Sequence, residues 1–162
     1  MRCTRCSAKH ETAAILLDRA LAIDPTSAWA WERSGWLKAY TGEPDAAIRD
    51  FHRAIQLEVP HSPNGNRFVG IGCAHFDSGR YEAGALWMRR AILEQPGTVW
   101  VNRTLAVSYA RMGQQIAARD SLEALRRYCP DLTITRVVGA LPFRRTFMER
   151  VAEGLDDLGL PP

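Results

Sequence analysis

The sequence lacks the features that mark secreted, membrane-spanning or strongly nucleic-acid-binding proteins. Four cysteines in 162 residues do not make a disulfide framework, and no apolar run reaches the roughly 18 residues that a membrane-spanning helix requires. The basic and then apolar start is interrupted by Asp18 and Arg19, and no signal-peptide cleavage site follows. The net charge of +3 gives no reason to expect a membrane or nucleic acid as the partner. We therefore expect a cytoplasmic protein.

Catalytic and metal-binding patterns are also scarce. Cys3, Cys6 and His10 form a CxxC pair with a following histidine, which makes them weak candidates for zinc ligands. A structural zinc site usually has four ligands, and the sequence holds no second pair, so we expect neither a metal nor a cofactor. Cys73 and Cys129 fall in expected helices and are predicted to be small core residues. No histidine lies in a nucleophile motif, and we expect no catalysis.

The sequence does contain an internal repeat of small residues. The corresponding positions are offset first by 37 and then by 34 residues, as from Gly35 to Gly72 and on to Ala106. A period near 34 that repeats a helix–turn–helix is typical of a tetratricopeptide array. The other two corresponding sets are Gly42, Gly79 and Gly113, and Ala47, Gly84 and Ala118.

Each recurring residue type has a physical reason. Alanine or glycine is needed where two helices cross closely, because a larger side chain does not fit there. Glycine suits the turn, since the residue that ends a helix commonly needs a positive φ. Proline stops the second helix of each pair from continuing. Prolines follow the expected second helices at Pro25, Pro60, Pro96 and Pro130.

These repeats resemble the tetratricopeptide family over residues 12–130. The resemblance implies an all-α fold, a right-handed superhelical solenoid of antiparallel helix pairs with a C-terminal capping helix. We expect a polar tail at 1–11, a half repeat at 12–25, repeats at 26–60, 64–96 and 98–130, and a capping segment at 131–162. The expected helices begin and end near residues 12–24, 27–40, 67–77, 81–94, 98–111, 115–128, 132–138 and 145–158, and Pro44 is expected to open one more.

We expect the first unit to be a half repeat that lacks its first helix. Ala13, Leu17 and Ala20 match positions 34 residues further on in the second helix of the next unit, but nothing before them is long enough for a first helix. The chain therefore resembles a fragment or a shortened form of a longer protein. We expect the apolar face of this helix to be uncovered, which favours a homodimer. At the other end, the helix at 145–158 is amphipathic and is expected to cover the last hydrophobic face.

A narrower resemblance concerns three segments. SAWAWERSGWLKAYTGEPDAAIRDFHRAI, GCAHFDSGRYEAGALWMRRAI and LPFRRTFMERVAEGLDDLGLPP are similar to the C-terminal repeat region of bacterial class III adenylate/guanylate cyclases. In that group a catalytic domain precedes the repeats. Nothing here corresponds to that domain or to its metal-binding aspartates, so the resemblance implies a signalling context and no enzymatic activity.

In the family that the repeats resemble, the first helix of each pair lines an inner groove. Trp29, Trp36 and Tyr40 are spaced so that they share one face of such a helix. Tryptophan and arginine are enriched at binding hot spots, which predicts a peptide groove with aromatic pockets and arginines for an acidic group. The alternative is that some of these rings pack between repeats or against the C-terminal helix. The predicted groove residues are Trp29, Glu32, Trp36, Tyr40, Asn66, Cys73, Asp77, Trp100, Arg103 and Arg111.

The sequence thus favours a protein–protein interaction module in bacterial signalling. Its partner would be a protein or peptide held in the concave groove, with no membrane involved. One alternative is the detached regulatory end of a nucleotide cyclase. Another is a helical-repeat nucleic-acid binder, for which the arginine doublets at 89–90, 126–127 and 144–145 are the only support.

Overall fold

The computed structural model describes residues 4–59, 62–140 and 142–162, with side chains from Lys9 onward. Within these ranges every regular element is helical, and no strand occurs. None of these helices is long and apolar enough to cross a membrane. The elements are α1 (Thr4–Ile23), α2 (Ala28–Thr41), α3 (Pro44–Leu57), α4 (Gly65–Asp77), α5 (Tyr81–Glu94), the 3-10 turn η1 (Val99–Val101), α6 (Asn102–Arg111), α7 (Gln115–Tyr128), α8 (Ile134–Gly139) and α9 (Arg145–Asp157).

The ends of the helices follow from local chemistry. Ser27 caps α2, since its side-chain oxygen accepts a hydrogen bond from the backbone N–H of Ala30 at 3.3 Å. The predicted turn glycines are confirmed, because Gly42, Gly79 and Gly113 have φ values of 88°, 74° and 74°, in the left-handed region that side chains disfavour. Each of them directly or closely follows the first helix of a pair. Pro44 opens α3 as expected.

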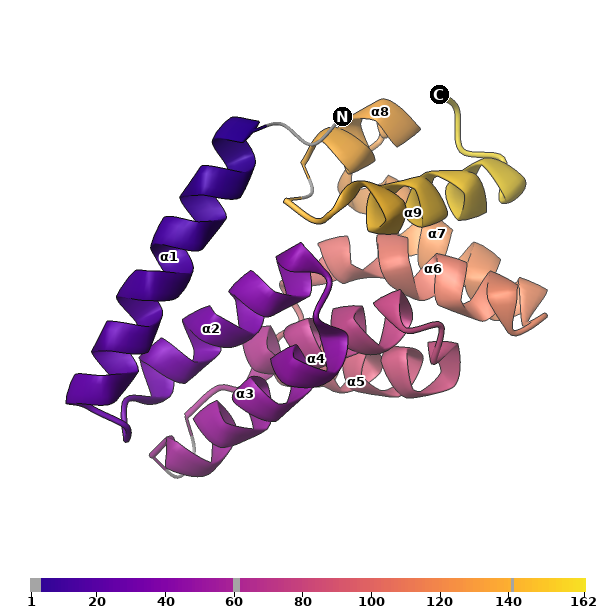
Figure 1. Cartoon of the computed structure of the whole chain (residues 1–162). Helices are drawn as coiled ribbons and strands as arrows, with labels where there is room; N and C mark the ends of the chain where they lie inside the picture. The colour runs from indigo at the N-terminus through magenta and orange to yellow at the C-terminus, as the bar shows by residue number, and fades with distance from the viewer. Residues whose placement is uncertain (1–3, 60–61, 141) are drawn as a thin grey trace.

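The helices pack in adjacent pairs that follow the order of the chain. Each helix from α1 to α6 contacts the one that follows it, and in addition α2 contacts α4 and α4 contacts α6. Figure 1 shows this succession from the indigo α1 to the orange α7. We call the surface formed by α2, α4 and α6 the inner face, because these first helices lie beside one another. The second helices α3, α5 and α7 form the outer face.

Small residues bring the helices of this array close together. Phe51 of α3 is fully buried, and its ring lies between Gly35 of α2 and Gly70 of α4. A Cβ atom added at Gly35 would lie 3.0 Å from that ring, and one added at Gly70 would clash with it. In the next pair, a Cβ at Gly72 would lie 3.2 Å from the carbonyl oxygen of Gly84. The predicted close crossings at Gly35, Gly72 and Gly84 are confirmed, whereas the one at Gly70 was not predicted.

The N-terminal helix differs from its expected length. It begins at Thr4 rather than near residue 12, because no proline or glycine before Pro25 stops it. The helix packs on α2, and Ala13, Leu17 and Ala20 are half-buried. The expected uncovered face is thus partly covered within the chain, and the homodimer stays a prediction. Pro60, one of the four expected helix stops, lies outside the described residues.

The C-terminal segment covers part of the inner face. Helix α9 contacts α6 and α8, and Figure 1 shows it beside α6 with α8 above it. The ring of Phe147 lies 5.1 Å from that of Phe76 in α4, and Gly154 packs directly against Val107 of α6. The amphipathic helix expected at this end is therefore present, and the hydrophobic face that it covers belongs to the first helices of the array.

Candidate ligand pocket on the inner face

A pocket of about 350 Å³ opens on the inner face next to the C-terminal segment. Four parts of the chain form its walls: α2, α4, the η1–α6 region and the segment between α8 and α9. Its size falls within the range of natural small-ligand sites. The residues that line this inner pocket are Arg33, Trp36, Tyr40, Asn66, Cys73, Trp100, Arg103, Ala140, Pro142 and Phe143.

The structure brings six of the ten predicted groove residues together in this pocket. They come from three helix pairs that the repeat register aligned, which is why the sequence could place them near one another. Four lining residues were missed. Arg33 is three residues before Trp36 and seven before Tyr40, so helical spacing offered a signal for it. Ala140, Pro142 and Phe143 lie where the period is lost, and no sequence signal places them here.

Aromatic rings form one wall of the pocket and tie it to the core. Trp36 is only 8% exposed, stacks on Tyr40 at 5.5 Å and meets Phe51 edge-on at 5.4 Å. Tyr40 meets Phe143 at 5.0 Å, and its backbone carbonyl accepts a hydrogen bond of 3.0 Å from the N–H of Arg144. The packing alternative considered for these rings therefore holds for Trp36 and Tyr40, although both still line the pocket.

Glu32 lies outside the pocket lining and serves a structural network. Its carboxylate accepts hydrogen bonds from Arg33 at 2.6 Å, Asn66 at 2.7 Å and Arg67 at 2.9 Å. Arg67 also donates to Asn64 at 2.7 Å and pairs with Glu58. We call Glu32, Glu58, Asn64 and Arg67 the Arg67 network. Because both carboxylate oxygens of Glu32 already accept hydrogen bonds from these neighbours, Glu32 is not available for the predicted contact with a ligand.

Arg103 is the pocket residue with the least compensated charge. Its guanidinium lies 4.8 Å from the centre of the Trp100 ring, and its Nε is buried without a hydrogen-bond partner. Burial lowers the pKa of Arg103, and the groups that oppose this shift are Cys73 and Tyr40 rather than a carboxylate. Among the described residues, Arg103 has no ion-pair partner.

The two groups that could become anions in the pocket stay neutral near pH 7. Burial raises the pKa of the Cys73 thiol to about 12, and burial also raises the pKa of Tyr40. A thiol or phenol in this state neither balances the guanidinium nor acts as a nucleophile. The pocket thus combines aromatic walls with an unbalanced cation, which suits binding rather than covalent or acid–base chemistry.

The remaining predicted groove residues lie elsewhere. Asp77 is buried beneath the C-terminal segment, where its Oδ2 pairs with Arg144 at 2.9 Å and its Oδ1 has no partner. Arg111 lies 3.8 Å from Glu153 of α9. Both therefore contact the C-terminal segment, and neither lines the pocket. Trp29 is 65% exposed at the edge of α2.

The structure describes only one of the three weak metal candidates with its side chain. The side chains of Cys3 and Cys6 lie outside the described residues, while His10 lies on α1. Across the part of the chain whose side chains the structure describes, no group of three histidine, cysteine or acidic residues is placed to hold a metal. His75 takes part in a polar contact instead, because its Nδ1 accepts a hydrogen bond of 2.9 Å from Arg80.

Comparisons with known proteins add no family assignment. No protein-family model matches the chain, and no curated protein matches it. The tetratricopeptide and cyclase resemblances therefore stay predictions from the sequence. The function has to be inferred from the geometry of the inner face.

Proposed function

We propose that the chain is a non-catalytic tetratricopeptide-like module that binds a polypeptide partner on its inner face. Three properties support this proposal: the helix–turn–helix units recur in register, the first helices lie beside one another, and the pocket between them is aromatic and cationic. Such a face offers rigid rings and charged groups at low entropic cost, which is typical of hot spots in protein interfaces.

The observation that carries the proposal is the way in which α9 lies on this face. An amphipathic helix from the chain itself contacts α6 through its apolar side, and Phe147 meets Phe76 of α4. Arg150 of α9 donates to the backbone carbonyls of Phe76 and Asp77 at 3.1 and 2.9 Å. The inner face thus already holds one helical segment, and helix-in-groove recognition of a partner uses the same physics.

The part of the inner face that α9 leaves open is where a partner would bind. It includes the exposed ring of Trp29, the exposed Arg33 and Asn66, and the pocket with Arg103. An apolar side chain would pack among the rings while an acidic group approaches the arginines. The similarity of three segments to the repeat region of bacterial cyclases supports a signalling context for this binding.

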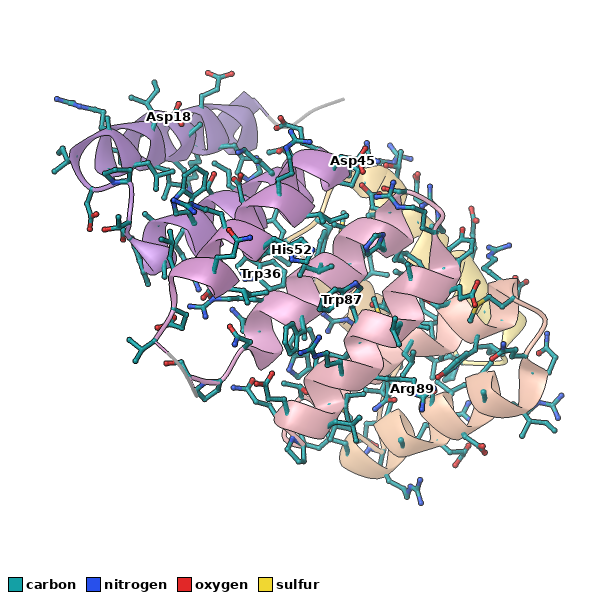
Figure 2. All side chains as sticks on the ribbon, turned by 90° about the horizontal axis from the view of Figure 1, so that it is seen from below. Asp18, Trp36, Asp45, His52, Trp87 and Arg89 are labelled. Carbon is teal, nitrogen blue, oxygen red and sulfur yellow. The ribbon has the colours of Figure 1, made fainter. Side chains whose placement is uncertain are left out.

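A random peptide library selected against the purified full chain tests the proposal. We expect selected peptides to combine apolar and acidic residues, and to bind at least tenfold more weakly to the Trp29→Ala and Arg103→Gln variants. Trp29 is exposed, so its substitution does not disturb the core. Arg89→Gln, on the exposed surface of α5 (Figure 2), is the matched control and should bind like the wild type. A library that yields no binder, or binders equally tight on all variants, would refute this role.

A further inference from the structure

Arg103 is a half-buried arginine that has no counter-charge among the described residues. The Nε of Arg103 is buried and unpartnered among the described residues. The titratable groups there that favour its charged form are Cys73 and Tyr40, which are both neutral at pH 7. Its contact with the Trp100 ring stabilises the cation but accepts no hydrogen bond from Nε. The described residues supply no carboxylate that balances this guanidinium. Because Arg103 lines the pocket, an anion bound there would pair with its charge.

The space next to Arg103 has the shape and lining for a flat apolar body. Trp36, Tyr40, Trp100 and Phe143 supply rings from three separate parts of the chain. Cys73 is a small neutral side chain among them. Rings of this kind stack on other rings in offset or edge-on arrangements. The volume of about 350 Å³ suits a small organic molecule.

The C-terminal segment limits how far a ligand can extend. Pro142 and Phe143 line the pocket, and Phe143 stacks on Phe147 at 4.0 Å. The next residue, Arg144, is held by Asp77 at 2.9 Å. The inner face beyond the pocket is thus already filled, so a long chain cannot continue from the pocket in that direction. A small molecule fits within this boundary.

We propose that the inner pocket is a binding site for a small aromatic carboxylate, whose ring lies among Trp36, Trp100 and Phe143 and whose carboxylate pairs with Arg103. This site goes beyond the proposed function, because it needs no polypeptide partner. Binding uses a charge-assisted hydrogen bond, which is stronger in a partly buried site than in water.

Matched acid and amide ligands test the proposal on the full-length protein. Phenylacetate and indole-3-acetate are titrated by calorimetry beside phenylacetamide and indole-3-acetamide, which have the same rings without the charge. We expect each acid to bind at least tenfold more tightly than its amide. The same affinity for acid and amide, or no binding of either acid, would overturn the proposal whatever the peptide library yields.

Two variants locate the effect at the pocket. Arg103→Met removes the cation and should bring the acid-to-amide affinity ratio to within twofold of one, while Arg89→Met on the outer face should leave the ratio unchanged. A ratio that persists in Arg103→Met would overturn the proposal. If that variant does not fold, the indole N–H signal of Trp100 in the wild-type protein, assigned with Trp100→Phe, replaces it: the acids should shift this signal, and an unshifted signal would reject the site.

Discussion

Arg67 of α4 and Arg103 of α6 differ in the groups that surround their guanidinium groups. The side chain of Arg67 is 7% exposed and is surrounded by the carboxylates of Glu32 and Glu58 and the amide of Asn64. Arg103 has an aromatic ring beneath it and no acidic partner among the described residues. The comparison teaches that this fold can supply counter-charges to a buried arginine, and that it does not do so at the pocket.

The difference has a physical meaning because burial of a cation costs free energy unless partners replace its water. In the Arg67 network the partners come from α2 and from the end of α3, so the ion pairs also hold α4 in place. At Arg103 the contact with the Trp100 ring offsets part of this cost, and no carboxylate among the described residues offsets the rest. Natural proteins commonly retain a destabilising feature of this kind at a functional site. An anionic ligand would lower the free-energy cost of the buried charge at Arg103.

The largest loss in the free energy of unfolding is expected when the Arg67 network is broken. Arg67→Met leaves Glu32 and Glu58 without their shared cation, and removal of one member of a buried pair typically costs about 3–5 kcal/mol. Urea denaturation followed by circular dichroism should show a loss in the free energy of unfolding near this size. A loss below about 1 kcal/mol would mean that the network is not structural, and the contrast with Arg103 would disappear.

A smaller loss is expected from Arg144→Met. Asp77 has a side chain that is 3% exposed and Arg144 one that is 39% exposed, so the pair is buried on one side only. The variant leaves a buried carboxylate without its charged partner, which costs about 1–3 kcal/mol. The C-terminal segment should also exchange its amide hydrogens faster. Arg145→Met, at a position where the arginine is exposed and pairs within α9, is the control and should be nearly neutral.

Arg103→Met should change stability much less than Arg67→Met, although both remove the same charge. The variant loses a cation–π contact of about 0.5–2 kcal/mol and also removes the cost of an unpaired buried cation, so the net change should stay below about 1 kcal/mol. The same urea titration measures it. A loss as large as that of Arg67→Met would show that Arg103 has a structural partner after all.

The last prediction is that the thiol of Cys73 does not react with an alkylating reagent. A thiolate here would give Arg103 an internal counter-charge, but a pKa of about 12 leaves the thiol protonated at pH 8. Cys73 should therefore remain unmodified by iodoacetamide while the half-buried Cys129 reacts, as judged by mass spectrometry of the peptides. Rapid alkylation of Cys73 would indicate a thiolate and remove the basis of the comparison.

Much of the array could be predicted from the sequence because its causes are local. The glycines at positions 42, 79 and 113 specify turns by their backbone freedom, and Gly72 and Gly84 specify a close crossing by their size. The repeat register then correctly grouped six of the residues that line the pocket. These predictions used spacing and side-chain volume, which a single sequence displays directly.

The parts that could not be predicted depend on contacts between distant segments. Glu32 was a groove candidate until its carboxylate proved to be shared by Asn66 and Arg67, more than thirty residues away. Asp77 was another, and its partner Arg144 lies 67 residues further on. The period ends after Pro130, so nothing in the sequence placed Phe143 against Tyr40. Contacts between such distant segments cannot be predicted from the spacing of residues in one sequence.

The pocket draws its walls from Arg33 near one end of the chain and Phe143 near the other, and this has a consequence during synthesis. A ribosome that has released the helix pairs but not the segment after Pro130 presents an array whose binding site is still missing a side. The proposed ligand could therefore be captured only after the segment that contains Phe143 has left the ribosome. A prematurely terminated product could fold its hairpins and would still fail to recognise the ligand.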